Sequence, residues 1–280
     1  MIRIKSAAIA AVLMLLVGTA VGYFVLPRSG QNSTLLAGQT IILSEGYSVT
    51  EAETLTKVAI DSMLRASGDQ WGRYIAGSVE QEEVVASPTS LETSTIKNIR
   101  IIKVSNFNLG TTKLLKREIL KLTPDQKVIL DLRGNSGGLL AEAVSSSSLF
   151  LTSELVTTVT SRSADPVSLY ADGAGRRDVA VVVLIDASTA SSAEIVAAAI
   201  QDHGRGVVVG SRSYGKASVQ ESFELPNKAQ LLLTVGRFVR PSGVEIDGAG
   251  IEPDVPVAAT GDALKIAVTV VSGLVAESGD

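Results

Sequence analysis

Apolar strands that alternate with helices constrain the fold of this chain most strongly. Residues 127–132, 179–185 and 206–210 are almost continuously apolar, and helical patterns over 139–151 and 193–201 follow the first two. Strands that are apolar on both sides are typical of a sheet that helices cover on both faces. Aromatic residues make up only 4% of the chain, so Val, Ile, Leu and Ala must fill this core. The pattern predicts an α/β architecture.

We expect further elements around this core. They are a strand over 99–104 before a helix over 111–122, a hairpin formed by 218–225 and 230–239, and helices over 48–65 and 263–274.

The amino-terminal residues are typical of a membrane anchor. Residues 7–26 are uncharged and mostly apolar, which is long enough to cross a hydrocarbon core of about 30 Å. Arg3 and Lys5 precede this stretch and favour a cytoplasmic amino terminus. A cleaved signal peptide usually has a shorter apolar region and a small-residue cleavage site. We therefore expect a retained anchor, with the rest of the chain extracytoplasmic, or secreted if the segment is cleaved.

The chain accordingly divides into five predicted regions. They are a signal anchor or transmembrane helix over 1–27, a polar Gly/Ser-containing linker over 28–45, a helical region over 46–96, a core over 97–258 and a carboxyl-terminal helix over 259–280.

Composition excludes several kinds of chemistry. The chain has no cysteine and one histidine, which excludes a thiolate nucleophile and argues against a metal site; we expect no metal and no cofactor. The net charge is −4 and no basic stripe is interleaved with aromatics, which argues against nucleic acid as a partner.

His203 follows Ser191 by 12 residues; across a helix this is ~18 Å, outside hydrogen-bond reach. Lysine is therefore the remaining candidate base for a serine nucleophile.

Ser191 has two interpretations. With Glu194 it fits a capping box at the start of an apolar helix, which is a structural role. A serine at a helix start after a buried strand also places its hydroxyl where N–H groups and the helix dipole favour developing negative charge.

Two glycine-containing turns also have two interpretations. The turn that ends in Gly137 and Gly138 follows a buried strand; it can supply positive φ, or bring N–H groups close to a substrate carbonyl. The turn that ends in Gly215 and Lys216 matches most of a phosphate-binding loop. However, Ala217 stands where that loop needs Ser or Thr, and a strand pattern follows instead of a helix. These two differences argue against a phosphate-binding loop and therefore against an NTPase.

Four motifs, in this order over roughly residues 97–258, resemble the carboxyl-terminal processing peptidases, also called tail-specific proteases: LDLRGNSGGLL, STASSAEIVAAAIQDHGRGVVVG, SYGKASVQ and RPSGVEIDGAGIEPDV. The resemblance implies a crotonase/ClpP-like ββα spiral core. It also implies a serine endopeptidase that cleaves protein or peptide substrates near C-terminal tails by a Ser-Lys dyad.

The resemblance also assigns residues. Ser191 is the implied nucleophile, Lys216 the base, 25 positions later, and Gln220 the third residue. The implied oxyanion hole consists of the N–H of Ser192 and that of the glycine pair, taken as Gly137. A lysine acts as a base only when neutral, and desolvation lowers its pKa. No acidic residue lies within three positions of Lys216.

The chain departs from the family pattern in three places. Ser192 adds a second serine beside the nucleophile, and Gly72 replaces a serine of the helical region. Only 24 residues separate Tyr74 from Ile99, too few for the PDZ domain of typical members. The alternative is a catalytically silent, membrane-anchored scaffold or peptide-binding module of the same fold. An activating partner or a homo-oligomer is also left open.

Overall fold

The computed structural model describes residues 31–48, 50–77, 90–123, 125–173, 175–258 and 260–275. The chain forms two compact units: Met1–Gln81 with Gln220–Val235, and Glu82–Val219 with Gly236–Asp280. The predicted span over 7–26 lies outside the described residues. Of the helices in the described ranges, none is long and apolar enough to cross a membrane.

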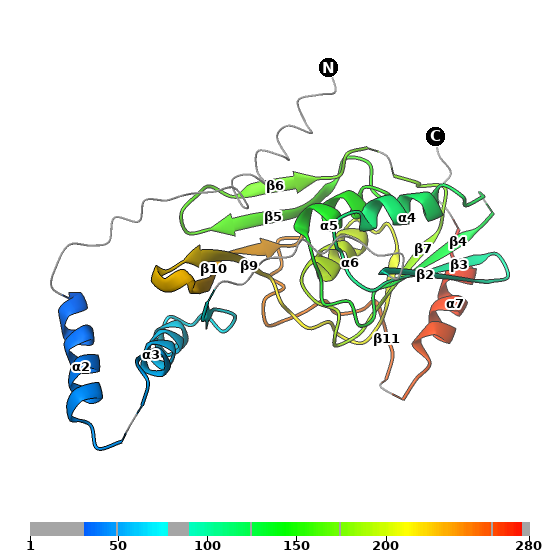
Figure 1. Ribbon diagram of the computed structural model, residues 1–280. Coiled ribbons are helices and arrows are strands. Elements are labelled where there is room, and N and C mark those ends of the chain that lie inside the picture. Colours follow the sequence, from blue (N-terminus) through cyan, green and yellow to red (C-terminus); the bar gives the residue numbers. More distant parts are fainter. Residues whose placement is uncertain are drawn as a thin grey trace. The chain divides into compact units, whose positions relative to one another are not determined.

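In the described residues, the first unit contains two helices and a small antiparallel sheet. Helix α3 (Ala52–Ala66) buries Leu64 and leads into strand β1 (Arg73–Ile75). Strand β1 pairs with the first half of β10 (Gln230–Val239), which also pairs with β9 (Ser218–Glu224). The short 3₁₀ helix η2 (Pro226–Lys228) connects β9 to β10 (Figure 1). The predicted hairpin is therefore confirmed.

The remaining described helix of this unit lies in the segment predicted to be a linker. Residues Gln31–Glu45 form helix α2, within the predicted linker 28–45. Leu, Ala, Gln and Ile dominate the second half of this segment and allow a helix. Apolar side chains such as Leu35 and Ile41 are exposed on α2. They therefore do not form the buried apolar face whose periodicity identifies a helix in a sequence.

The second unit is built on a six-stranded sheet with the order β11-β8-β7-β4-β3-β2. All neighbouring strands are parallel except β2 and β3. The strands are β2 (Leu91–Ile96), β3 (Ile99–Val104), β4 (Lys127–Asp131), β7 (Val181–Ile185), β8 (Val207–Gly210) and β11 (Val255–Pro256). The expected α/β architecture is confirmed.

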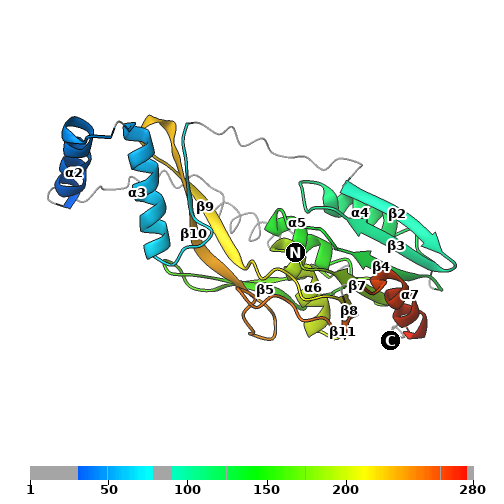
Figure 2. The ribbon, with the colours of Figure 1, turned by 90° about the horizontal axis from the view of Figure 1, so that it is seen from below.

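Four helices accompany this sheet (Figures 1 and 2): α4 (Thr111–Ile119), α5 (Leu140–Ser147), α6 (Ser192–Asp202) and α7 (Ala263–Gly273). Ala267 and Val271 of α7 pack in one cluster with Ile129, Val182 and Leu184 of the strands. Every residue of β7 is buried, as expected for a strand covered on both faces. A closely packed sheet of this kind provides a rigid support for the loops at its edge.

Besides the two-residue β11, three strands of the second unit were not predicted. Strands β5 (Leu155–Ser161) and β6 (Val167–Tyr170) form an antiparallel pair, and β5 also pairs with the end of β10. Strand β2 lies at the sheet edge with five of its six residues exposed. Because these strands are rich in Ser and Thr and only partly buried, they lack the apolar pattern that identified the central strands.

A loop before β5 contains an unusually acidic glutamate. Glu154 Oε2 accepts hydrogen bonds from the N–H groups of Thr152 and Ser153 at 2.6 and 2.9 Å, and Arg177 Nη1 lies 2.5 Å from Oε1. Burial alone would raise the pKa of Glu154, but the N–H donors and the Arg177 guanidinium outweigh it and lower the pKa to about 2.

We expect Glu154→Gln to lower the free energy of unfolding at pH 7 by on the order of 2 kcal/mol. A carboxylate with a lowered pKa stabilises the fold above its unfolded pKa, and this contribution is lost as pH falls toward 2. Urea unfolding should therefore show a difference from the parent that shrinks between pH 5 and pH 3. Glu252→Gln, in an exposed ion pair with Arg212, should have little effect at any pH. A Glu154→Gln difference independent of pH would contradict the assignment.

Candidate active site

Three loops follow the parallel strands β4, β7 and β8, and each contains one of the sequence motifs. They cover residues 132–139, 186–191 and 211–217. Because the carboxyl ends of parallel strands meet at the same edge of a sheet, these loops lie together. All three belong to the second unit.

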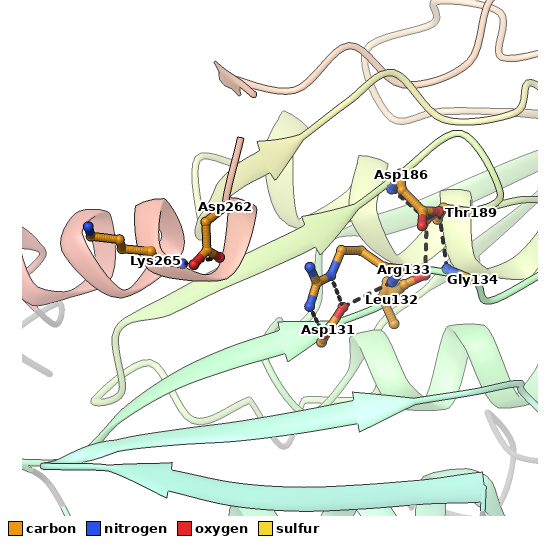
Figure 3. A network of polar contacts seen from close by, with 8 residues as sticks. All are labelled: Asp131, Leu132, Arg133, Gly134, Asp186, Thr189, Asp262 and Lys265. Atoms are coloured by element: carbon orange, nitrogen blue, oxygen red, sulfur yellow. Dashed lines mark hydrogen bonds and ion pairs between the residues drawn. The ribbon is translucent and has the colours of Figure 1, made fainter. Parts of the chain in front are cut away.

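Side chains connect the first two loops (Figure 3). Thr189 Oγ1 donates to the carbonyl oxygen of Leu132 at 3.0 Å, and the Gly134 N–H donates to Asp186 Oδ1 at 3.1 Å. The Thr189 hydroxyl also accepts the Asp186 N–H at 2.9 Å. The loop that carries the candidate nucleophile is therefore fixed to the glycine loop at two points.

An ion pair braces the beginning of the glycine loop. Arg133 Nε and Nη2 lie 2.8 and 2.6 Å from the two carboxylate oxygens of Asp131, which is buried. This bidentate contact raises the pKa of the Arg133 guanidinium, with smaller contributions from Asp186 and Asp262. Figure 3 shows Asp262 at the start of α7, where its side chain accepts the Lys265 N–H at 3.1 Å.

Asn135 fixes the rest of the glycine loop. Its side chain is fully buried, donates from Nδ2 to the Val104 carbonyl at 2.9 Å and accepts the Gly137 N–H at 2.8 Å. Its backbone carbonyl accepts the Ala190 N–H at 2.9 Å. The N–H of Gly137, the expected oxyanion donor, is thus directed to Asn135 in this structure.

Ser191 occupies the N-cap of α6 in a strained backbone conformation. Its φ is 55° and its ψ is −122°, a region that residues with a side chain rarely adopt. Such strain costs about 1–3 kcal/mol and is typical of functional sites. A serine on a sharp turn between a strand and a helix is also the geometry of a nucleophile elbow. The predicted helix start at Ser191 is confirmed.

Gly137 lies directly against this serine. Its φ is +111°, and a Cβ placed on it would be 2.8 Å from Ser191 Cβ and 3.0 Å from the Ala190 carbonyl oxygen. The position therefore admits only glycine, because both the conformation and the space exclude a side chain. The structure thus places Gly137 beside Ser191.

Ser192 is placed so that its side chain is not available for chemistry. The residue is only 1% exposed, and its Oγ donates to the Gly138 carbonyl oxygen at 2.9 Å. Of the two adjacent serines, Ser191 is therefore the better candidate nucleophile.

Glu194 connects the serine to the lysine loop. Its carboxylate is fully buried, and Oε2 accepts the backbone N–H groups of Ser191 at 2.8 Å and Lys216 at 2.9 Å. Oε1 accepts the Gly215 N–H at 2.7 Å and the Ser213 hydroxyl at 2.5 Å. The capping box predicted the contact with Ser191, and the structure confirms it. The contacts with the lysine loop were not predicted; an acid directly before the apolar run 195–200 was the available signal.

Lys216 and Gln220 lie at the start of the hairpin. Lys216 is half-buried and precedes β9, so a strand follows it, and the helix that a phosphate-binding loop requires is absent from this described segment. Gln220 belongs to the first unit. The structure thus brings Ser191, Gly137, Ser192 and the backbone of Lys216 together, and places Gln220 in the other unit.

One contact of Gln220 lies within the first unit. Its Nε2 donates to the Trp71 carbonyl oxygen at 2.8 Å. Asp69 shapes this turn by accepting the N–H groups of Trp71 and Gly72 at 3.1 and 2.9 Å, and Thr234 donates to it as well. A Cβ at Gly72 would lie 2.7 Å from Asp69 Oδ2. A side chain at position 72 would therefore require the Asp69 carboxylate to move.

His203 lies at the opposite end of α6 from Ser191. It is the C-cap residue, and its Nε2 forms a 2.7 Å hydrogen bond with the Leu155 carbonyl oxygen. This position agrees with the prediction that it is not the base. Among the described residues, no group of three His, Asp or Glu side chains could hold a metal ion.

We expect Gly137→Ala to destabilise the protein more than Gly134→Ala does. Both glycines have a positive φ, which costs a side chain roughly 1–2 kcal/mol. Only Gly137 has neighbours that a Cβ would overlap, whereas the space around Gly134 is open within 4 Å. Overpacking should add about 1–3 kcal/mol. Urea unfolding of the two variants measures the difference. Equal losses would contradict the close contact with Ser191.

Comparisons with known proteins agree with this geometry. The model of peptidase family S41 matches residues 98–257. The carboxyl-terminal-processing protease of Picosynechococcus sp. is 32% identical over 181 residues, which cover 63% of this chain and 44% of the relative. The carboxy-terminal-processing protease of Bartonella bacilliformis is 34% identical over 164 residues, covering 57% and 38%.

A lipoprotein structure from Streptococcus agalactiae has a TM-score of 0.63 at 18% identity, covering 87% of this chain and 89% of that one. At this identity the likeness shows the fold alone. The chain spans less than half the length of the two relatives above. Because the family model covers more than half of the chain, the predicted resemblance is confirmed: this chain belongs to peptidase family S41, the family of the carboxyl-terminal processing proteases.

Proposed function

We propose that this chain is a serine endopeptidase in which Ser191 is the nucleophile and Lys216 the base. The observation that carries the proposal is the strained N-cap position of Ser191, packed against Gly137 and joined through Glu194 to the backbone of Lys216. Membership of a peptidase family supports the same assignment. Nothing in the site favours the silent scaffold, because each candidate side chain is retained.

In the proposed reaction, Ser191 Oγ attacks the carbonyl carbon of the scissile peptide while its proton passes to neutral Lys216 Nζ. The resulting oxyanion needs N–H donors. When the intermediate collapses, the carbon–nitrogen bond breaks, and the protonated lysine returns the proton to the leaving amine. Water then attacks the acyl carbon while Lys216 accepts one of its protons. The bond between Ser191 Oγ and the acyl carbon breaks, and the protonated lysine returns the proton to Oγ.

Two backbone N–H groups are proposed as the oxyanion hole. Ser192 supplies the first, at the positive end of α6. The second comes from the glycine pair. Because the Gly137 N–H donates to Asn135, we assign this role to the N–H of Gly138. In the described part of the chain, neither the Ser192 N–H nor the Gly138 N–H donates to another residue.

Lys216 must be neutral to act as a base. Removal from water favours the neutral form of a lysine, and Lys216 is half-buried. By resemblance, Gln220 orients the lysine amine without adding charge.

The substrates are proposed to be protein chains cut near their carboxyl termini, as the printed names of the relatives suggest. Between the end of β1 at Ile75 and the start of β2 at Leu91 there are 15 residues, which supports the expectation that no PDZ domain is inserted there. An activating partner or self-association is the proposed substitute.

The proposal also includes the cellular location of the protein and the detailed arrangement of its core. The apolar stretch over 7–26 supports a membrane anchor with the peptidase on the extracytoplasmic side. The strand and helix units of the core are proposed to form the ClpP-like spiral.

We expect the full chain in mild detergent to cleave β-casein, and Ser191→Ala and Lys216→Ala each to lower the rate at least about 10³-fold, since each removes one half of the dyad. Ser188→Ala should keep the parental rate, because Ser188 is exposed in the same loop and outside the proposed dyad. Gel electrophoresis and mass spectrometry of the products measure the rates.

Loss of cleavage in Ser191→Ala but not in Lys216→Ala would contradict the lysine base. An inactive parent would favour the scaffold or a requirement for an activating partner.

A further inference from the structure

We propose that Glu194 is a positioning residue that fixes the nucleophile and the base relative to each other. This inference rests on the proposed function, because it assigns Glu194 a role in the reaction of Ser191 and Lys216. Glu194 does not itself act on the substrate, since its carboxylate is fully buried.

The argument begins with one shared oxygen atom. Glu194 Oε2 accepts the N–H of Ser191 at 2.8 Å and the N–H of Lys216 at 2.9 Å. The two amide nitrogens therefore lie no farther apart than about 5.7 Å, the sum of these two distances. Residues 25 positions apart in the chain are thus held together through their backbones, so any shift of the carboxylate moves both.

The second oxygen holds the approach to Lys216. Glu194 Oε1 accepts the Gly215 N–H and the Ser213 hydroxyl. The Ser213 hydroxyl in turn accepts the Ile251 N–H at 2.6 Å, and the Ser213 N–H donates to the Ile251 carbonyl at 3.1 Å. The lysine loop therefore has several consecutive attachments to one side chain, which restricts its path toward β9.

The same carboxylate supports the strained conformation of Ser191. A residue at φ 55° keeps that conformation only if its surroundings hold it. The bond from the Ser191 N–H to Glu194 is one such constraint, and the carboxylate is in turn stabilised in the interior by four donors. Loss of the carboxylate should release Ser191 and the lysine loop together.

Two substitutions at Glu194 distinguish the effect of losing its negative charge from the effect of losing its hydrogen bonds. In Glu194→Gln the amide oxygen can keep the contacts with Ser191 and Lys216, but the NH₂ group then faces the Gly215 N–H, which cannot accept a hydrogen bond. Glu194→Ala removes all four contacts. The matched control is Asp202→Asn at the other end of α6, because Asp202 is a buried carboxylate that binds Arg240 and the Ser242 N–H.

The first readout is kinetic. With the full chain and a fluorogenic peptide built on a mapped β-casein cleavage site, we expect Glu194→Gln to lower kcat about 10- to 100-fold, because a small misplacement has this effect, while KM changes less than about 3-fold. Glu194→Ala should lower kcat further. Asp202→Asn should lose a comparable amount of thermal stability but keep its kcat.

The second readout does not depend on activity. Hydrogen–deuterium exchange should become faster in Glu194→Ala over residues 189–193 and 214–218 together, and stay unchanged over 240–244. In Asp202→Asn, exchange should become faster over residues 240–244 and stay unchanged over 189–193 and 214–218. If the parent chain has no peptidase activity, the proposed function fails. The same exchange result would then still support the positioning role of Glu194.

Faster exchange in only one of the two loops would overturn the inference. If Glu194→Gln and Asp202→Asn both lost kcat in the same proportion to their loss of thermal stability, this would also overturn the inference.

Discussion

The buried carboxylate of Glu194 is the interaction on which the rest of the site depends. A charge inside a protein is costly unless hydrogen bonds replace its water, and here every donor comes from the start of α6 or from the lysine loop. The cost of burial and the geometry of the site are therefore linked. The loops cannot separate without leaving the carboxylate without its donors.

The sheet supplies the second constraint. Parallel strands β4, β7 and β8 place three loops at one edge, and the buried Asn135 fixes the glycine loop beside Ser191. Gly137 then fits against Ser191 with no room for a side chain. The strain at Ser191 is thus supported by packing on one side and by hydrogen bonds on the other.

The sequence predicted the parts of this arrangement that have a local pattern. The strand over 99–104 and the helix start at Ser191 follow from apolar periodicity and the capping box, and the structure confirms both. The contact between Glu194 and Lys216 spans 22 positions, and no local rule links residues so far apart. Helix α2 (Gln31–Glu45) was not predicted, because apolar side chains such as Leu35 and Ile41 are exposed on it and form no buried, periodic face.

The central claim is that Ser191 is a nucleophile activated by Lys216. Its most direct test is to incubate the full chain with an activated ester and to locate the acyl group by mass spectrometry of the digested protein. The account predicts one adduct, on Ser191, that is absent in Lys216→Ala. An adduct on Ser188 or Ser192 instead, or an equal yield on Ser191 without Lys216, would contradict it.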